Sequence, residues 1–210
     1  MPRLEFFFDI SSPWTYLAFT QIEQVVAEIG GTLDYRPILV GGVFNAVNDS
    51  VYASRENPNP VKLRHYVKDL ADWARYVGIT IGQPPVFPVN SVKVMRGCFV
   101  AAEKGLLRPY ARALFEAYWG RLEDISQDSV IVPVLDRVGI GRAEFFEKIG
   151  TAAYKDRLRA NTDELIARGG FGSPTMFVDG TDMYFGNDRL PLVAAALRTK
   201  PSPPREERVG

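Results

Sequence analysis

Apolar positions near the N-terminus change from a strand-like run to helical spacing and back again. Leu4–Phe8 is a mainly apolar run between charged residues, long enough for one buried strand. Apolar residues then recur at helical spacing from Trp14 to Ile29, and Gly30-Gly31 ends the predicted helix. Thr32–Arg36 predicts a second strand that stops at Pro37. A strand, a helix and a strand in this order favour a right-handed parallel crossover.

Helical spacing dominates the middle of the chain. Gly41–Pro60 is rich in Gly, Asn, Ser and Pro and predicts a long loop, whereas Val61–Val77 predicts an amphipathic helix. The prolines of Gly82–Asn90 exclude a helix there. We then expect four short helices and one longer helix, over Val94–Glu103, Pro109–Gly120, Ser129–Gly139, Arg142–Ile149 and Thr151–Arg168.

Strand-like runs return near the C-terminus. Thr175–Val178 predicts a strand, Asp179-Gly180 a tight turn, Met183–Phe185 the antiparallel return and Arg189–Leu197 a last helix. The order β-α-β, helices, β-β-α predicts an α/β domain with an all-helical insertion. We expect the α/β domain over residues 1–45 and 160–198, the insertion over 46–159, and a Pro-rich, charged, disordered tail over 199–210.

The composition restricts the possible functions. The chain has 25 Lys+Arg and 25 Asp+Glu with no basic block, which argues against nucleic-acid binding. It has neither a signal peptide nor an apolar run of about 18 residues, so we expect a cytoplasmic protein that does not span a membrane. One cysteine, Cys98, and one histidine, His65, exclude an intramolecular disulfide and a zinc site of the Cys/His type. No metal site is predicted, and Cys98 is interpreted as a small core residue.

Two Ser-Pro pairs mark the two halves of the predicted sheet domain. Ser12-Pro13 stands at the start of the first helix, and Ser173-Pro174 directly precedes the third strand. This arrangement resembles thioredoxin-like proteins, in which the helix start carries Cys-x-x-Cys and the proline is cis. Here the two cysteine positions are Ser12 and Thr15, so dithiol chemistry is excluded.

Several longer segments narrow the resemblance. The segments FFFDISSPWTYLAF, YRPILVGGVFNA, FPVN, MRG, ARGGFGSPTMFVDG and YFGNDRL resemble the 2-hydroxychromene-2-carboxylate isomerase family. That family is close to the kappa-class glutathione transferases and to the DsbA-like thioredoxin fold. The resemblance extends to about Leu197 and implies glutathione as cofactor, an aromatic 2-oxo acid as substrate, and a homodimer. The implied reaction interconverts 2-hydroxychromene-2-carboxylate and trans-o-hydroxybenzylidenepyruvate in aromatic compound catabolism.

Under this resemblance Ser12 donates a hydrogen bond to the glutathione thiolate. Lowering a thiol pKa from about 8.5 to about 6.5 requires roughly 2.7 kcal/mol of thiolate stabilisation. A helix N-terminus contributes about 0.3–1 kcal/mol, and a hydrogen bond to a charged group about 1.5–3 kcal/mol. The two contributions together suffice. A plain helix cap is the alternative role for Ser12 from its own segment, and the second motif favours the functional role.

The resemblance implies further contacts. The backbone of Ser173, beside a cis Pro174, would pair with the cysteinyl part of glutathione, and the start of the last helix would bind its γ-glutamyl end. The residues implied in these and other contacts are Ser173, Pro174, Asn187, Asp188, Lys62, and Asn48 or Asp49 for glutathione, with Trp14 over the aromatic substrate. The alternative roles are a structural turn for Ser173-Pro174 and a helix cap for Asp188. Lys62 has a solvated charge as its alternative role, and Trp14 a place in the core. His65 is a weaker candidate for a general acid or base.

Three positions depart from the family pattern. Asn45 stands where many members carry lysine, Ile10 replaces a common aromatic residue, and Thr15 stands where serine is frequent. Two alternative functions follow: a kappa-type transferase or peroxidase acting on other electrophiles, and a non-catalytic binding protein on the same fold.

Overall fold

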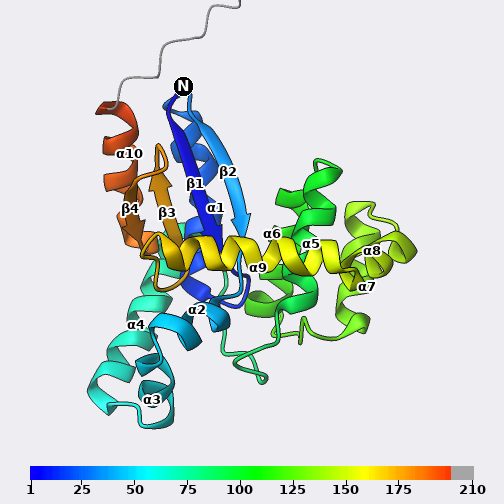
Figure 1. Cartoon of the computed structure of the whole chain (residues 1–210). Coiled ribbons are helices and arrows are strands. Elements are labelled where there is room, and N and C mark those ends of the chain that lie inside the picture. Colours follow the sequence, from blue (N-terminus) through cyan, green and yellow to red (C-terminus); the bar gives the residue numbers. More distant parts are fainter. Residues whose placement is uncertain (200–210) are drawn as a thin grey trace, which may run out of the picture.

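The computed structural model describes residues 1–199 and contains one mixed sheet (Figure 1). Its strands are β1 (Arg3–Phe8), β2 (Thr32–Pro37), β3 (Thr175–Val178) and β4 (Asp182–Phe185), in the order β2-β1-β3-β4. β2 pairs with β1 in parallel, whereas β3 is antiparallel to β1 and β4 is antiparallel to β3. Asp179 and Gly180, between β3 and β4, both have positive φ, as the predicted tight turn requires. The predicted β-α-β…β-β-α order is confirmed.

The helices lie close to their predicted ranges, apart from two additional ones. Within residues 1–199 they are α1 (Pro13–Ala27), α2 (Val40–Val47), α3 (Ser50–Glu56), α4 (Pro60–Val77), α5 (Val92–Glu103), α6 (Leu107–Phe115), α7 (Asp128–Val138), α8 (Arg142–Gly150), α9 (Ala152–Ala167) and α10 (Leu190–Thr199). A π-helical turn, η1 (Glu116–Gly120), extends α6, and a 3-10 turn, η2 (Asn187–Arg189), precedes α10. The tail predicted from residue 199 lies, beyond Thr199, outside the described residues.

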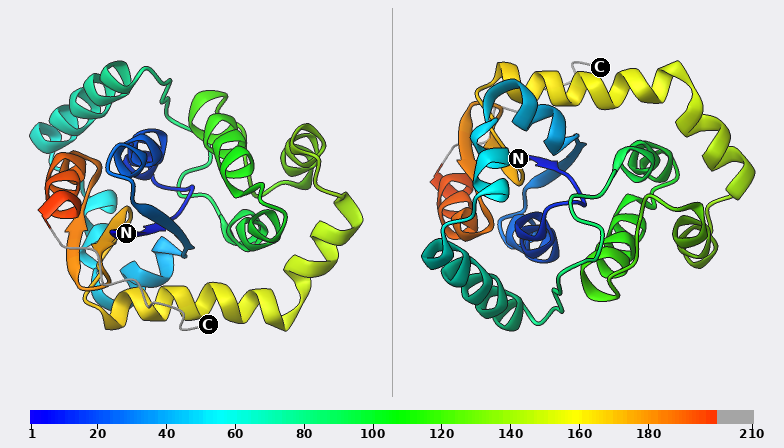
Figure 2. Two further views of the ribbon diagram at one scale, coloured as in Figure 1. Left: turned by 90° about the horizontal axis from the view of Figure 1, so that it is seen from above. Right: turned by 90° about the horizontal axis from the view of Figure 1, so that it is seen from below.

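Each face of the sheet is covered by helices. Successive side chains of a strand point to opposite faces, so β1 contributes to two apolar clusters. Leu4, Phe6 and Phe8 belong to the larger cluster, which includes residues of α1 and α10. Phe7 belongs to a smaller cluster with Ile38, Val43, Leu165 and Phe177, on the side of α2 and α9. The sheet is therefore the middle layer between α1 with α10 and α2 with α9 (Figure 2).

The helices α5–α8 gather beside the β2 edge of the sheet, and α9 returns from them across it (Figure 1). α9 runs without interruption across residue 160, where we predicted the boundary of the insertion. Residues of the sheet and of α5–α8 share the larger apolar cluster. The Trp119 indole of η1 also donates a hydrogen bond to the Ile10 carbonyl, with the two atoms 2.9 Å apart. The helical part therefore supports the turn between β1 and α1.

The prediction of a long loop over Gly41–Pro60 was wrong, because this segment contains α2 and α3. Its Gly and Asn content lowers intrinsic helix propensity, but tertiary contacts outweigh that preference. Val43 is fully buried in the smaller cluster. At the start of α2, the Leu39 N–H donates to the Thr162 hydroxyl of α9 at 3.0 Å. Packing on α9 therefore stabilises this helix.

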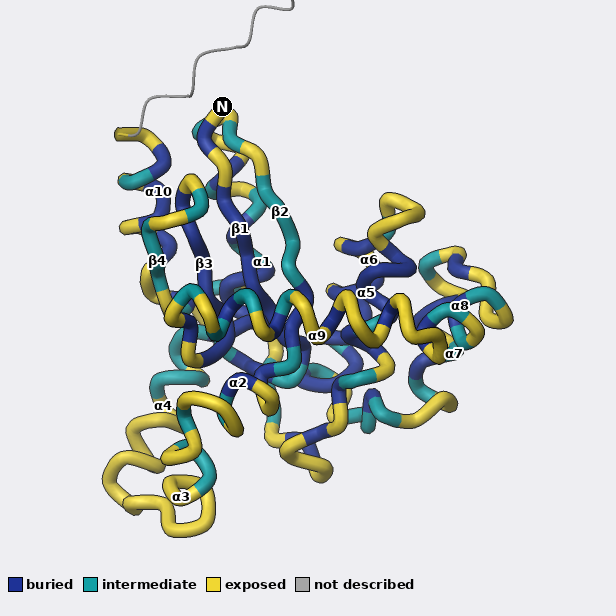
Figure 3. The backbone as a smooth tube through the Cα atoms, viewed as in Figure 1, coloured by how far each residue is buried: buried dark blue, intermediate teal, exposed yellow. Residues whose placement is uncertain are grey.

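Several apolar side chains of α4 are exposed. Val61, Val67 and Tyr76 retain 65%, 59% and 78% of their accessible surface. In Figure 3, α3 and the first half of α4 are mostly exposed. Within residues 1–199, no helix combines the length and the hydrophobicity needed to cross a bilayer.

Gly97 of α5 lies at a close approach in the core, and its replacement tests this packing. A Cβ at this position would overlap the Tyr110 hydroxyl and the Phe145 ring, both fully buried. We expect Gly97→Ala to lower the free energy of unfolding by about 1–3 kcal/mol or more, because the buried rings must move. Urea unfolding measures the change. Gly150→Ala, with open space around the added Cβ, is the matched control and should stabilise by about 0.4–1 kcal/mol. Equal effects of the two variants would contradict the packing described here.

Candidate functional site

The two Ser-Pro motifs meet at the end of the sheet. Ser12 is the N-cap of α1, where its hydroxyl oxygen accepts a hydrogen bond from the Thr15 N–H at 3.2 Å. The same hydroxyl donates to the backbone carbonyl of Ser173 at 3.0 Å. The Ser173–Pro174 peptide bond is cis, in agreement with the resemblance. Residues 161 positions apart are thus joined by a single hydroxyl group.

Thr15 and Asp9 extend this contact into a small polar cluster. The Thr15 and Ser173 hydroxyls lie 2.7 Å apart, and the Ser173 hydroxyl accepts from the Asp9 N–H at 3.0 Å. Ser12, Thr15 and Ser173 are all buried, with 8%, 0% and 6% of their surface exposed. The backbone N–H of Ser173 has no hydrogen-bond partner among residues 1–199. A buried donor without a partner at this point suits an extended ligand that pairs with the backbone.

The carboxylate of Asp9 is a functional feature that the sequence interpretation did not identify. It accepts hydrogen bonds from the N–H groups of Ser11 and Val40, each at 2.9 Å, and from the Ser91 hydroxyl at 3.2 Å. Burial raises the pKa of Asp9, although these hydrogen bonds act in the opposite direction. Its signal in the sequence is an acidic residue between a buried strand and a helix start. Asp9 thereby connects the turn before Ser12 to the start of α2 and to the residue before α5.

The start of the last helix lies beside the cis proline. The Gly186 N–H donates to the Pro174 carbonyl at 3.1 Å, which brings η2 to the end of β3. Asp188 does not cap the last helix with its side chain. Its carboxylate, 46% exposed, instead pairs with Arg189 at 2.8 Å. The N–H groups of Asn187 and Asp188 are not used by the hydrogen bonds of this turn.

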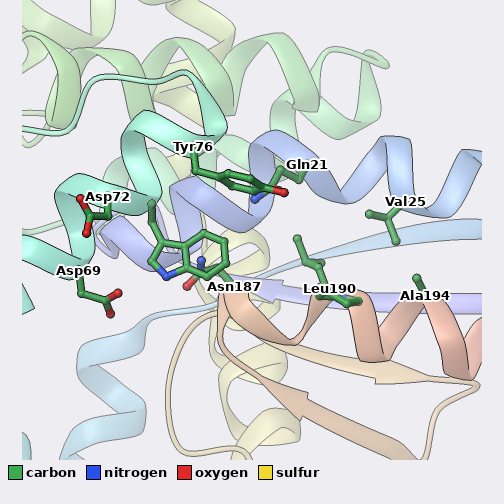
Figure 4. A pocket seen from close by; sticks show the side chains of 10 residues that line it. Gln21, Val25, Asp69, Asp72, Tyr76, Asn187, Leu190 and Ala194 are labelled. Carbon is green, nitrogen blue, oxygen red and sulfur yellow. The ribbon is translucent and has the colours of Figure 1, made fainter.

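Asn187 lines a pocket between α1, α4 and α10 (Figure 4). Its side chain is buried, and the amide nitrogen has no hydrogen-bond partner within residues 1–199. The pocket has a volume of about 450 Å³, and its other lining residues are Gln21, Val25, Asp69, Asp72, Trp73, Tyr76, Leu190, Pro191 and Ala194. Neither Ser12 nor Ser173 lines it. Of the predicted glutathione residues, only Asn187 belongs to this pocket.

The environments of the other predicted binding residues differ. Trp14 is half-buried, and its ring meets that of Tyr66 from α4 at 5.7 Å. The Asn48 amide donates to the Phe171 carbonyl at 3.1 Å, next to the Ser173 loop. Lys62 is exposed in the first turn of α4 and makes no side-chain hydrogen bond or ion pair within residues 1–199. The roles of these three residues in binding remain predictions.

The remaining candidates have simpler environments. His65 is exposed on α4, and Asn45 and Asp49 are exposed around the end of α2. Cys98 is fully buried, and burial raises the pKa of its thiol well above its ordinary value, so its interpretation as a core residue is confirmed. In the described part of the chain, His, Cys, Asp and Glu side chains do not gather into a cluster that could hold a metal ion.

Comparison with known proteins agrees with this fold. A family model for the DSBA-like thioredoxin domain matches residues 3–198. The chain is 32% identical over 198 residues to 2-hydroxychromene-2-carboxylate isomerase of Pseudomonas putida, covering 92% of this chain and 93% of that protein. It is 28% identical to glutathione S-transferase kappa 1 of Rattus norvegicus, covering 97% and 96%. A solved structure of 2-hydroxychromene-2-carboxylate isomerase aligns with a TM-score of 0.78 and 29% identity, covering 93% of this chain and 94% of that chain.

The sheet order and the joined Ser-Pro motifs define a thioredoxin-like protein with hydroxyl groups at the dithiol positions. The chain belongs to the DSBA-like thioredoxin domain family, and within it to the group of 2-hydroxychromene-2-carboxylate isomerases and kappa-class glutathione transferases. The predicted thioredoxin-like fold is thereby confirmed.

Titration of Asp9 should make the free energy of unfolding depend on pH. Its native pKa is raised above the unfolded value, so the folded state disfavours the charged form. Relative to Asp9→Asn, the unfolding free energy of the wild type should be highest below about pH 4 and should fall as the pH rises through the native pKa. Urea unfolding of both proteins from about pH 3.5 to about pH 8 measures this difference. A difference that stays constant over this range would contradict the prediction. Asp163→Asn, exposed on α9, is the control and should change stability by less than about 0.5 kcal/mol.

Proposed function

We propose that this protein is a glutathione-dependent isomerase of aromatic 2-oxo acids, of the type that interconverts 2-hydroxychromene-2-carboxylate and trans-o-hydroxybenzylidenepyruvate. The observation that carries the proposal is the Ser12 hydroxyl, held at the N-terminus of α1 beside Ser173 and a cis Pro174. The 32% identity to an isomerase over nearly the whole chain supports the reaction type.

The hydrogen bonds of Ser12 and Ser173 fit an exchange with glutathione. Ser12 now donates to the Ser173 carbonyl, and the Ser173 N–H has no partner within residues 1–199. When Ser12 turns its donor to the ligand's sulfur, the Ser173 carbonyl becomes free to accept from the ligand's cysteinyl N–H. The Ser173 N–H can donate to the ligand's carbonyl in the same strand-like pairing. Every group released by the exchange therefore finds a new partner.

The start of α10 supplies a second anchor. The N–H groups of Asn187 and Asp188 suit the γ-glutamyl carboxylate, and the exposed Asp188 carboxylate suits the neighbouring ammonium. Because the Asn187 side chain is buried and lines the pocket, we assign the contact of this residue to its backbone. Lys62, and Asn48 beside Phe171, remain further proposed contacts with glutathione.

Ser12 performs the step that prepares the reaction. Its hydroxyl and the N-terminus of α1 stabilise negative charge on the sulfur, and the burial of this point strengthens both interactions. Bound glutathione supplies a thiolate for reversible addition to the conjugated double bond, so that rotation and elimination complete the change of geometry. Trp14, half-buried next to Tyr66, covers the aromatic part of the substrate.

We further propose a cytoplasmic homodimer that acts in aromatic compound catabolism. The apolar side chains exposed along α4 support an association of two copies, because contiguous exposed apolar surface marks interaction sites. The resemblance to the isomerase family implies the same assembly and pathway.

A kappa-type glutathione transferase is the second candidate function. The identity to rat glutathione S-transferase kappa 1 extends over 97% of this chain, and the proposed glutathione site would serve both activities. Only the electrophile differs, so parallel assays with the chromene acid and with an aryl halide separate the two functions.

Ser12→Ala tests the proposed function. We expect kcat/KM for the glutathione-dependent isomerisation of 2-hydroxychromene-2-carboxylate to fall at least about tenfold, since one charge-assisted hydrogen bond disappears. Near-ultraviolet absorbance measures the reaction. Thiolate absorbance of the bound glutathione should titrate at higher pH in the variant. Ser129→Ala, exposed at the start of α7, is the control. Equal rates for wild type and Ser12→Ala would refute the role of Ser12.

Asp188→Asn tests the second anchor. Loss of the negative charge should weaken glutathione binding about tenfold, measured by isothermal titration calorimetry, because the ligand's ammonium loses its counter-charge. Asp163→Asn should bind glutathione as the wild type does. An unchanged affinity in Asp188→Asn would exclude Asp188 from the site.

A further inference from the structure

Two aromatic rings lie near the joined Ser-Pro motifs. Phe44 of α2 approaches the backbone of Gly172, next to Ser173, so closely that a Cβ there would lie 3.8 Å from its ring. Phe87 packs against Trp119 with ring centroids 6.1 Å apart, and the Trp119 indole donates to the Ile10 carbonyl. One ring therefore adjoins the second motif, and the other adjoins the turn that leads to Ser12.

The guanidinium of Arg55, from α3, spans these two rings. Its central carbon lies 5.5 Å from the Phe44 centroid and 5.1 Å from the Phe87 centroid. Burial raises the pKa of Tyr66, and the nearby positive charge of Arg55 acts in the opposite direction. Because Tyr66 meets Trp14, Arg55 also lies near the aromatic residue proposed to cover the substrate.

This cation has no anionic partner in the described part of the chain. Arg55 makes neither an ion pair nor a hydrogen bond within residues 1–199, whereas Arg36 and Arg168 both pair with Glu164. Rings that cover the face of a guanidinium displace water from that face and leave the N–H groups at its edge. Those groups form the planar fork that matches a carboxylate in two parallel hydrogen bonds.

We propose that Arg55 binds the carboxylate of an anionic aromatic substrate and so selects acidic electrophiles over neutral ones. This inference rests on the proposed function, in that the acid would react at the neighbouring sulfur of glutathione held by Ser12. Phe44 and Phe87 hold the guanidinium near the Ser-Pro motifs, and Trp14 with Tyr66 contacts the aromatic body of the ligand. A neutral electrophile would gain nothing from Arg55.

A pair of isosteric probes tests the selection without requiring turnover. The full chain is titrated by calorimetry with trans-cinnamate and with trans-cinnamamide, in the presence and in the absence of S-methylglutathione. We expect the wild type to bind cinnamate about tenfold more tightly than the amide or better, because a hydrogen-bonded charge pair is lost with the amide. Arg55→Gln should reduce this ratio to about one, and Arg55→Lys should restore part of it.

Arg64→Gln is the matched control. Arg64 is exposed on α4 and has neither a ring contact nor an ion pair among residues 1–199. This variant should keep the wild-type preference for cinnamate. Equal binding of the two probes by the wild type, or the same loss in Arg64→Gln as in Arg55→Gln, would overturn the inference. Weaker binding of S-methylglutathione in Arg55→Gln, with the probe ratio unchanged, would also overturn it by assigning Arg55 to glutathione. The proposed function fails separately, if wild type binds neither glutathione nor S-methylglutathione.

Discussion

The site depends on one buried carboxylate. Asp9 ends the first strand and accepts hydrogen bonds from three segments: the turn into α1 at Ser11, the start of α2 at Val40, and the residue before α5, Ser91. Burying a charge without partners costs several kcal/mol, so these donors are what allows Asp9 to remain there. In return the carboxylate fixes where α1 and α2 begin. The positions of Ser12 and of the Phe44 ring on α2 follow from that geometry.

Hydroxyl groups at the dithiol positions change what this fold can do. Two thiols there would exchange electrons with a substrate, whereas the Ser12 and Thr15 hydroxyls only donate and accept hydrogen bonds. The same geometry still offers a helix N-terminus, the backbone of Ser173 and a cis proline. In the proposed function these groups bind an extended ligand and stabilise an anion, and the sulfur arrives with glutathione. The exchange of partners between Ser12 and Ser173 makes such binding possible without leaving a buried polar group unsatisfied.

The residues proposed to select the electrophile lie outside the sheet. α2 provides Phe44, α3 provides Arg55, and α4 provides Tyr66 against Trp14. Trp119 from the helical part supports the turn before Ser12 from the other side. In the proposed function, the sheet and α1 hold the reactive centre, and the surrounding helices select the electrophile.

The sequence by itself determined the fold class, most element boundaries and the two Ser-Pro motifs, because apolar periodicity and turn residues are local signals. It also predicted Cys98 as a core residue. Tertiary structure alone decided that α2 forms within residues 41–60, since Val43 is buried with Leu165 of α9. It alone placed Asp9 among three donors and Arg55 between Phe44 and Phe87, residues far apart along the chain. Local pattern specifies which residues can form an element, whereas burial and partners in space decide what each charged side chain does.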